Sequence, residues 1–197
     1  MKPKVSILIP TYNREDYIEQ CLDSVLNQSF SDWEIIINDN ASTDKTWNIV
    51  QKYAQLDKRI KIAQNSSNLG PVKNWKCCLE RATGVYIHWL WSDDWVEPNF
   101  YVEMVKLVED NVGSVATCWN YRCEEGREKK VSWCYEFAEE DPLVAAKKIL
   151  LLTKELPLSP AAYLLPTNVV RANFHDNIPI DGDIDCVGRG IGPDWLM

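Results

Sequence analysis

The chain has 197 residues, of which 46% are hydrophobic and 25% are charged, and its formal net charge is −8 at pH 7. This length and composition predict one globular domain that buries an ordinary core without disulfide or metal support. An acidic chain that lacks a block of Lys and Arg also lacks the positive surface on which phosphate backbones bind, so nucleic acid is excluded as the main partner.

Strands and helices are expected to alternate through the first part of the chain. Short apolar runs, typical of buried strands, lie at residues 5–10, 33–37, 60–63 and 85–91. Segments with helical spacing of apolar residues follow Asn13, Asp44 and the turn at 68–71. The side chains of Asn13 and Asp44 are suited to cap helices, and Gly84 is expected to end the third helix.

This alternation over the first 120 residues predicts an α/β fold with a doubly wound, mainly parallel sheet flanked by helices. Ligands of such sheets bind at the carboxyl ends of the strands. Polar residues stand just past those ends and are expected to converge in space: Thr11, Tyr12, Asn13, Asp39, Asn40, Asp93 and Asp94.

The pattern changes after residue 120. A charged hairpin is expected at 120–135 and an amphipathic helix at 141–153, and prolines then separate short strands and loops. Residues 1–197 are interpreted as a single domain with two halves, 1–119 and a smaller mixed region at 120–197. The last ten residues look like a loop that enters a helix, so the natural chain is expected to continue beyond Met197.

The cysteines and the N-terminus bear on the cellular compartment. The chain has seven Cys and two His, with no C-x-x-C pair, so neither a disulfide framework nor a zinc site is predicted. No apolar stretch reaches the roughly 18 residues of a spanning helix, and the N-terminus lacks the apolar core of a signal peptide. A cytoplasmic protein without a transmembrane segment is expected, and peripheral association with the inner face of the membrane remains compatible with the sequence.

Two adjacent carboxylates, Asp93 and Asp94, follow the apolar strand at 85–91. Such a pair can hold a Mg or Mn divalent cation while substrate phosphates fill the other coordination positions. The alternative is that Ser92 or Asp93 caps a helix near Pro98. The pair by itself does not decide between these interpretations.

Four motifs follow one another in the order and at the spacing of a known family. They are Val5 to Arg14 (VSILIPTYNR), Glu34 to Asp44 (EIIINDNASTD), Asn68 to Gly70 (NLG), and Ala82 to Ile87 (ATGVYI) leading into Ser92-Asp93-Asp94. With these motifs, residues 4–100 resemble the N-terminal half of the family 2 inverting glycosyltransferases, which have the GT-A fold. The resemblance is weaker beyond residue 100.

The resemblance implies a nucleotide-diphosphate sugar, a divalent cation, and transfer to an acceptor hydroxyl with inversion at the anomeric carbon. It makes residues 1–119 the nucleotide-sugar-binding half and 120–197 the acceptor-side half. The sugar donor it implies is most commonly a UDP-sugar. The acceptor it implies is a glycan or lipid-linked glycan in surface polysaccharide biosynthesis.

Residues that hold the nucleoside follow from the same resemblance. Pro10, Thr11 and Tyr12 match the first-strand segment that lies against the base and ribose. Asp39 and Asn40 match a family pair that is usually Asp-Asp, one of which hydrogen-bonds the base. The amide of Asn40 offers both a donor and an acceptor, so it can still pair with a uracil edge.

The family often has Asp-x-Asp-Asp after the fourth strand, and here Trp91 stands at the first of these positions. Asp93 and Asp94 remain as the matching carboxylates, and the sequence leaves open which of them holds the metal. Asp93 is also expected at the nucleotide sugar. Trp95 lies beyond the carboxylates and is a candidate face for a sugar or base, whereas Trp89 and His88 are interpreted as core residues.

The diphosphate also needs positive charge from the protein. Arg14, Lys73 and Lys76 lie near the expected strand ends. In the family a basic residue on the third helix often contacts the diphosphate, but Trp75 occupies the matching position here. Lys73 or Lys76 is therefore a candidate substitute, and the alternative is that both are solvated helix charges.

Asp194 is the candidate catalytic base. Gly190 to Leu196 resembles the family segment whose Asp removes the proton from the acceptor hydroxyl, with Pro193 where Glu is common. A carboxylate can serve because the hydroxyl becomes acidic as its bond to the sugar forms. The alternative is that Asp194 only caps a helix.

The leading hypothesis is therefore an inverting, metal-dependent glycosyltransferase. The alternative is a catalytically silent nucleotide-sugar-binding domain, since Trp91 and Asn40 depart from the family pattern. A nucleotidyltransferase is disfavoured because no Gly-rich basic loop follows the first strand, and a Rossmann dehydrogenase because no G-x-G-x-x-G does.

Overall fold

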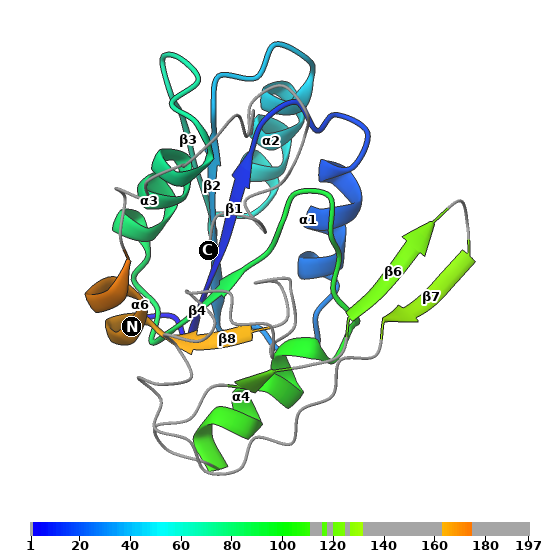
Figure 1. Ribbon diagram of the computed structural model, residues 1–197, viewed down its shortest axis with the longest axis vertical. Coiled ribbons are helices and arrows are strands. Elements are labelled where there is room, and N and C mark those ends of the chain that lie inside the picture. The colour runs from blue at the N-terminus through cyan, green and yellow to red at the C-terminus, as the bar shows by residue number, and fades with distance from the viewer. Residues whose placement is uncertain (1, 111–115, 118–119, 125–126, 132–162, 175–197) are drawn as a thin grey trace, which may run out of the picture.

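The computed structural model describes residues 2–110, 116–117, 120–124, 127–131 and 163–174 (Figure 1). Its strands are β1 (Val5–Thr11), β2 (Trp33–Asp39), β3 (Ile60–Gln64), β4 (Tyr86–Trp89), β5 (Ala116–Thr117), β6 (Asn120–Glu124), β7 (Arg127–Val131) and β8 (Tyr163–Pro166). Its helices are α1 (Ile18–Leu26), α2 (Thr46–Leu56), α3 (Pro71–Arg81), α4 (Phe100–Asp110) and α6 (Thr167–Asn173). The helix expected at 141–153 lies outside the described residues.

The main sheet has six strands in the order β3-β2-β1-β4-β8-β5. The first four strands in this order are parallel, and β8 runs antiparallel to both of its neighbours. β6 and β7 form a separate antiparallel hairpin inside the expected range. The chain builds the sheet from β1 outward through β2 and β3, then returns to add β4 on the other side. The carboxyl ends of β1 and β4 therefore flank a topological switch point, where α/β sheets bind ligands.

Apolar side chains cover both faces of the sheet because successive residues of a strand point to opposite sides. Ile7 and Ile9 of β1 belong to the core shared with α1, α2 and α4. Leu8, between them, belongs to the second core, which includes Trp75 of α3 and Val170 of α6. Figure 1 shows α3 on one side of the sheet and α1 on the other. The expected doubly wound α/β fold is confirmed.

Two boundaries differ from the sequence-based expectation. Helix α1 begins at Ile18 and Asn13 does not cap it. Asn13 instead has a φ of 50°, and its Oδ1 accepts a hydrogen bond from the backbone N–H of Thr43 at 2.9 Å. Strand β4 ends at Trp89, and the chain then turns so that the N–H of Asp94 donates to the carbonyl of Trp91. At Asn13 a contact with a residue 30 positions away overrides the local pattern, whereas beyond β4 a local turn follows the strand.

A buried carboxylate ties the amino-terminal parts of the strands together. Glu34 is 3% exposed, and it accepts hydrogen bonds from the Ser6 hydroxyl, the Thr83 N–H and the Lys61 ammonium. Burial by itself raises the pKa of Glu34, but the hydrogen bonds from Lys61, Ser6 and Thr83 outweigh it, so the pKa lies below its usual value. The carboxylate is therefore charged and paired within the fold.

Gly84 lies against this network. A Cβ at Gly84 would stand 2.6 Å from the backbone nitrogen of Ser6, closer than real side chains approach. Its N–H donates to the Ser6 hydroxyl at 2.8 Å. A glycine is thus required where the chain passes β1 on its way into β4.

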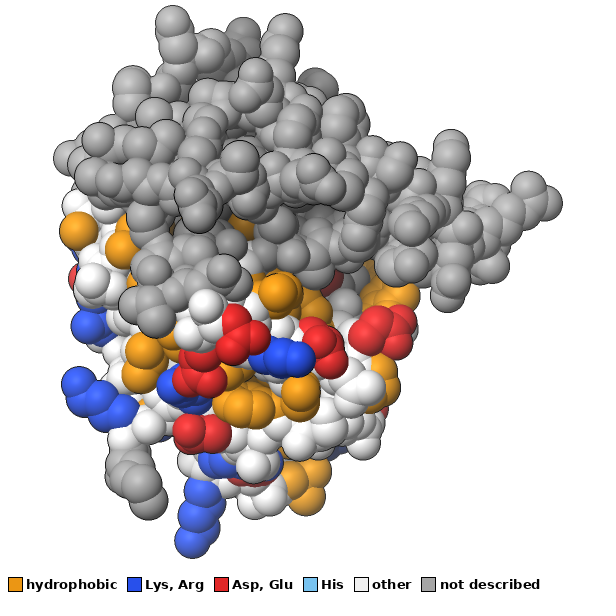
Figure 2. Space-filling model, turned by 90° about the horizontal axis from the view of Figure 1, so that it is seen from below, with side chains coloured by type: hydrophobic (Ala, Val, Ile, Leu, Met, Phe, Trp, Pro, Cys, Tyr) orange, Lys and Arg blue, Asp and Glu red, His pale blue; other side chains and the backbone are white. Residues whose placement is uncertain are grey.

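His88 is a core residue, as expected. It is fully buried, and its Nδ1 lies 2.7 Å from the hydroxyl of Tyr101 in α4. Trp89 is 3% exposed, which confirms its place in the core. On the face drawn in Figure 2, acidic and basic side chains are interspersed among apolar ones. None of the described helices is long and apolar enough to cross a bilayer.

Candidate functional site

The loops that follow β1 and β2 are fastened to each other by reciprocal hydrogen bonds. The N–H of Asn13 donates to the Ser42 hydroxyl, and the N–H of Glu15 donates to a carboxylate oxygen of Asp44. In return, the N–H of Lys45 donates to the Glu15 carboxylate. These bonds hold the two strand ends as one rigid edge. Partial burial raises the pKa of Asp44, but hydrogen bonds from the Thr46 side chain and from backbone N–H groups outweigh it, so this pKa lies below its usual value.

Asp39 is fully buried at the end of β2. Its Oδ1 accepts from the Ser42 N–H and from the Gln64 amide, both at 2.9 Å, and its Oδ2 accepts from the Ser42 hydroxyl. No described Lys or Arg pairs with it. The carboxylate orders the turn at Ser42 and retains acceptor capacity on Oδ2.

Asn40 is 3% exposed, and its side chain is occupied by neighbours within the chain. Its Nδ2 donates to Asn68 Oδ1 at 2.8 Å and to the carbonyl of Gly70. Its Oδ1 accepts from the Asn65 amide and from the Leu69 N–H, both at 2.9 Å. Both amide donors and both lone pairs are thus used within the chain, and Asn40 holds the loop between β3 and α3; its contact with a base stays a prediction.

Further amides extend this network beneath the loop. Asn38 donates to Asn65 and to Asn74 of α3, and Asn74 donates back to the carbonyl of Asn38 at 3.0 Å. We name Asn38, Asn40, Asn65, Asn68 and Asn74 the amide cluster. Sequence reasoning named only Asn40 of these five as a site residue, although Asn38 and Asn68 lie within the quoted motifs. The available signal was the run of Asn residues on either side of the turn at 68–71, which only the fold brings together with Asn38.

The carboxylates beyond β4 face the loop beyond β1. Arg14 Nε lies 3.4 Å from Asp93 Oδ2, and the same guanidinium donates to the carbonyls of Tyr12 and Asn13. Asp93 is exposed and Asp94 is half-buried. Burial, and then the charges of Asp94 and Asp93, raise the pKa of the nearby Cys21 thiol well above its usual value. Arg14 and Asp93, predicted from separate motifs, are therefore brought together.

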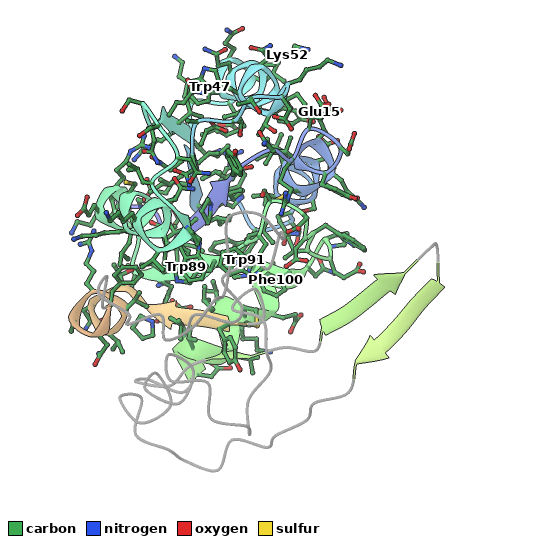
Figure 3. All side chains as sticks on the ribbon, turned by 45° about the horizontal axis from the view of Figure 1, so that its top comes forward. Glu15, Trp47, Lys52, Trp89, Trp91 and Phe100 are labelled. Carbon is green, nitrogen blue, oxygen red and sulfur yellow. The ribbon has the colours of Figure 1, made fainter. Side chains whose placement is uncertain are left out.

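Two buried polar side-chain atoms among the described residues have no hydrogen-bond partner. They are Thr11 Oγ1 and Trp91 Nε1. Thr11 is 2% exposed and Trp91 is 7% exposed. Figure 3 labels Trp91 and Trp89, and the ring of Trp75 on α3 contacts both, with centroids 4.6 Å and 5.4 Å apart respectively. Pro10 is buried beside Thr11, and Tyr12 is half-buried.

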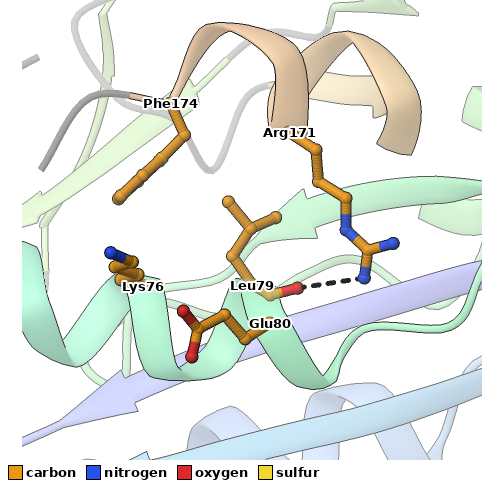
Figure 4. A pocket seen from close by; sticks show the side chains of 5 residues that line it. All are labelled: Lys76, Leu79, Glu80, Arg171 and Phe174. Atoms are coloured by element: carbon orange, nitrogen blue, oxygen red, sulfur yellow. Dashed lines mark hydrogen bonds between the residues drawn. The ribbon is translucent and has the colours of Figure 1, made fainter.

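The two lysines of α3 lie in different surroundings. Lys73 is exposed. Lys76 lines a pocket of about 450 Å³ with Leu79, Glu80, Arg171 and Phe174 (Figure 4). Arg171 in that pocket donates to the carbonyls of Leu79 and Ala82 at the end of α3. The pocket lies between α3 and the end of α6, and none of the predicted residues at the strand ends lines it.

Trp95 and Asp194 complete the predicted set. Trp95 is 41% exposed just beyond Asp93 and Asp94, so its face is open to solvent. Asp194 lies outside the described residues. Within the described part of the chain, no group of three or more His, Cys, Asp or Glu side chains could hold a metal ion. Asp93 and Asp94 could therefore supply only a partial ligand set, as Mg and Mn accept when phosphates complete the coordination.

Comparison with known families and proteins finds glycosyltransferases. The model of the family described as "Glycosyl transferase family 2" matches residues 6–160. The "Putative teichuronic acid biosynthesis glycosyltransferase TuaG" of Bacillus subtilis is 37% identical over 126 residues, covering 64% of this chain and 50% of the relative. The "GalNAc(5)-diNAcBac-PP-undecaprenol beta-1,3-glucosyltransferase" of Campylobacter jejuni is 39% identical over 93 residues, covering 47% and 30%.

Solved structures agree with this. Residues 1–349 of S. aureus TarS in complex with UDP align with a TM-score of 0.71 at 28% identity, covering 89% of this chain and 51% of that one. The mannosyltransferase PcManGT of Pyrobaculum calidifontis in complex with GDP-Man and Mn2+ aligns with a TM-score of 0.54 at 25% identity, covering 60% and 36%. The chain thus spans about half or less of the length of the proteins it matches.

Proposed function

The chain belongs to glycosyl transferase family 2, and we propose that it forms the nucleotide-sugar-binding part of an inverting, metal-dependent glycosyltransferase. The proposed sugar donor is a UDP-sugar, since the TarS fragment that the chain resembles forms a complex with UDP. The proposed acceptor is a hydroxyl of a glycan or lipid-linked glycan. Support comes from the names of the Bacillus and Campylobacter relatives, which refer to teichuronic acid and to an undecaprenol-linked glycan.

One observation carries the proposal: the carboxyl ends of β1, β2 and β4 bring Thr11, Asp39 and Asp93 to the same edge of the sheet. The contact between Arg14 and Asp93 closes this edge across the switch point. Buried polar atoms, one carboxylate with spare acceptor capacity and one exposed carboxylate are a suitable lining for a nucleoside and its diphosphate.

The residues present fit a divalent cation of the Mg or Mn type. Asp93 and Asp94 provide oxygen ligands only, and Asp93 is open to solvent, where a diphosphate can share the ion. The support includes the Mn2+ complex of PcManGT. When bound, such a cation supplies positive charge against the leaving diphosphate. It also offsets the acidic character of a chain whose formal charge is −8.

The protein's own residues then have distinct tasks. Thr11 and Tyr12 lie against the nucleoside, with Pro10 shaping the strand end beneath them, and Asp39 accepts from the base. Arg14 turns from Asp93 to the diphosphate, with Lys73 as a second cation. Lys76 is placed less well for this task, because it lines the pocket between α3 and α6.

Asp194 is proposed as the base. As the acceptor oxygen bonds to the anomeric carbon, the bond from that carbon to the diphosphate oxygen breaks, and the electron pair leaves with the nucleoside diphosphate. Asp194 takes the acceptor proton in the same step. Attack from the face opposite the leaving group inverts the configuration.

Thermal unfolding with UDP and GDP, each with and without MnCl₂, tests the sugar-donor class and the metal together. UDP at 100 times its Kd should stabilise the protein by about 2.7 kcal/mol, which corresponds to roughly 5–10 °C in Tm for a domain of this size. The stabilisation should be larger with Mn than without it, and larger for UDP than for GDP.

The Asp93→Asn variant should lose the Mn-dependent part of this shift. Asp110→Asn removes the same charge from the exposed end of α4 and should behave as the wild type. Metal-dependent UDP binding without turnover of any UDP-sugar would support the silent binding domain. The absence of any nucleotide binding would contradict both functions.

A further inference from the structure

The two unpartnered buried atoms lie at the same edge of the sheet. Leu8 of β1 pairs with Trp89 of β4, and the N–H of Leu90 donates to the carbonyl of Leu8. Thr11 is three residues beyond Leu8 and Trp91 is two residues beyond Trp89, so both stand at the carboxyl ends of these adjacent parallel strands. Among the described residues, these are the buried side-chain atoms that lack a partner.

An unpartnered buried donor costs about 1–3 kcal/mol, because it has lost its water without gaining another acceptor. Native structures keep few such atoms, and each calls for an explanation. Both of these atoms occur at the switch point, where this fold class binds ligands. A ligand bound at this edge can supply the acceptor that the Trp91 N–H lacks.

The indole of Trp91 is held rigidly. Its ring packs on Trp75 with centroids 4.6 Å apart and planes inclined by 33°. Its carbonyl accepts from the Cys21 thiol at 3.4 Å and from the Asp94 N–H. The ring and the backbone are thus both fixed before any ligand arrives, and Trp91 is only 7% exposed.

We propose that Trp91 is a specificity-determining residue whose Nε1–H donates a hydrogen bond to an oxygen of the bound nucleoside diphosphate. The inference rests on the proposed function and adds a contact to it. An indole N–H only donates, whereas a carboxylate at this place would only accept. Trp91 therefore selects a ligand oxygen that accepts the hydrogen bond. That oxygen belongs either to the ribose or to the diphosphate.

The Trp91→Phe variant removes the N–H and keeps an aromatic ring against Trp75. Its affinity for UDP, measured by calorimetry with Mn present, should fall about threefold to tenfold if the acceptor is a neutral ribose oxygen. The loss should be tenfold or more if the acceptor is a phosphate oxygen. Trp89→Phe is the matched control, because it trims the same kind of ring from the same cluster without removing an unpartnered buried donor.

Ligands that lack one ribose oxygen distinguish the two acceptors. If Trp91 donates to a ribose hydroxyl oxygen, one analogue lacks that oxygen. The wild type and Trp91→Phe should bind that analogue, 2′-deoxy-UDP or 3′-deoxy-UDP, with equal affinity. If it donates to the diphosphate, the variant should be weaker for both analogues. Equal affinity of the wild type and Trp91→Phe for UDP, or equal losses in Trp91→Phe and Trp89→Phe, would overturn the proposal. If the wild type binds no nucleotide, the proposed function itself fails.

A measurement on the wild type covers the case in which Trp91→Phe does not fold. In protein labelled with ¹³C and ¹⁵N, the indole N–H of Trp91 can be assigned through bonds, from its own ring to the backbone of Trp91. Addition of UDP and Mn should move this resonance downfield and slow its exchange with water. An unchanged indole resonance at saturating UDP would contradict the proposal.

Discussion

The side chain of Asn40 makes four hydrogen bonds within the chain, two as a donor and two as an acceptor. The family resemblance predicts an acidic residue here and a contact with the base. In the structure the amide has a positioning task, because an amide, unlike a carboxylate, can both donate to Gly70 and accept from Leu69. The neighbouring Asp39 keeps the acceptor capacity that a base would use.

Replacing Asn40 with the Asp that is usual in the family should therefore lower both the stability of this protein and its affinity for UDP. Asn40→Asp replaces two donated hydrogen bonds with oxygen facing the Asn68 and Gly70 oxygens, and we expect the free energy of unfolding to fall by about 1–3 kcal/mol. UDP affinity should fall with it, because the loop before α3 loses its anchor. Urea unfolding and calorimetry measure the two effects.

Asn48→Asp is the matched control for this change. Asn48 is exposed on α2, so the same added charge should alter stability by less than about 0.5 kcal/mol. If Asn40→Asp proved as stable as the wild type and bound UDP more tightly, Asn40 would be a base contact and not a positioning residue.

At the level of elements, the segment between α3 and β4 depends on close backbone packing. The N–H of Thr83 donates to the Ser6 hydroxyl of β1 and the Glu34 carboxylate of β2, and the N–H of Gly84 donates to the same Ser6 hydroxyl. Thr167, at the start of α6, donates to the carbonyl of Gly84 at 2.8 Å. The turn at residues 83–84 is thus hydrogen-bonded to β1, β2 and α6. It fixes the position at which β4 begins beside β1.

Gly84→Ala should be destabilising by about 1–3 kcal/mol. The added methyl would meet the Ser6 backbone at 2.6 Å, and a backbone atom in the centre of a sheet cannot move aside as a flexible side chain can. Val85→Ala, at the adjacent half-exposed position, should cost much less. Denaturant midpoints compare the two variants, and equal midpoints would show that the turn relaxes.

For the whole molecule, carboxylates that are hydrogen-bonded in the folded state make the free energy of unfolding depend on pH. The pKa of Glu34 is lowered by its hydrogen bonds in spite of burial, and the pKa of Asp57 is lowered chiefly by its hydrogen bond with Arg59. Each folded-state pKa lies below the unfolded value, near 4.5 for Glu and 3.8 for Asp. The stability they contribute is therefore present above those values and is lost as the pH falls through the folded-state pKa.

Glu34→Gln should reveal this dependence. At pH 7 the amide nitrogen would face the Lys61 ammonium, and we expect a loss of about 1–3 kcal/mol. The difference from the wild type should shrink as the pH falls below the ordinary glutamate value, since the wild-type carboxyl then also becomes neutral. Glu103→Gln on the exposed side of α4 is the control. A difference that stays constant down to pH 3 would contradict a charged Glu34.

The sequence by itself determined the succession of strands and helices, because a run such as Ile35 to Ile37 or the apolar spacing of α1 depends on near neighbours. It also indicated that Thr11, Asp39 and Asp93 stand at or just beyond the carboxyl ends of strands, and parallel strands bring such ends to one edge of the sheet. The resemblance of the motifs to one family followed from the same local patterns.

Which polar groups have partners became visible only in the assembled fold. Asn13 accepts a hydrogen bond from Thr43 and does not cap helix α1. Asn40 donates to Gly70 and accepts from Leu69. The indole N–H of Trp91 has no partner. The partners of Asn13 and Asn40 lie about 30 residues away along the chain. Hydrogen bonds between such distant residues leave no periodic trace in the sequence, so the roles of these side chains became visible only when the strands had assembled.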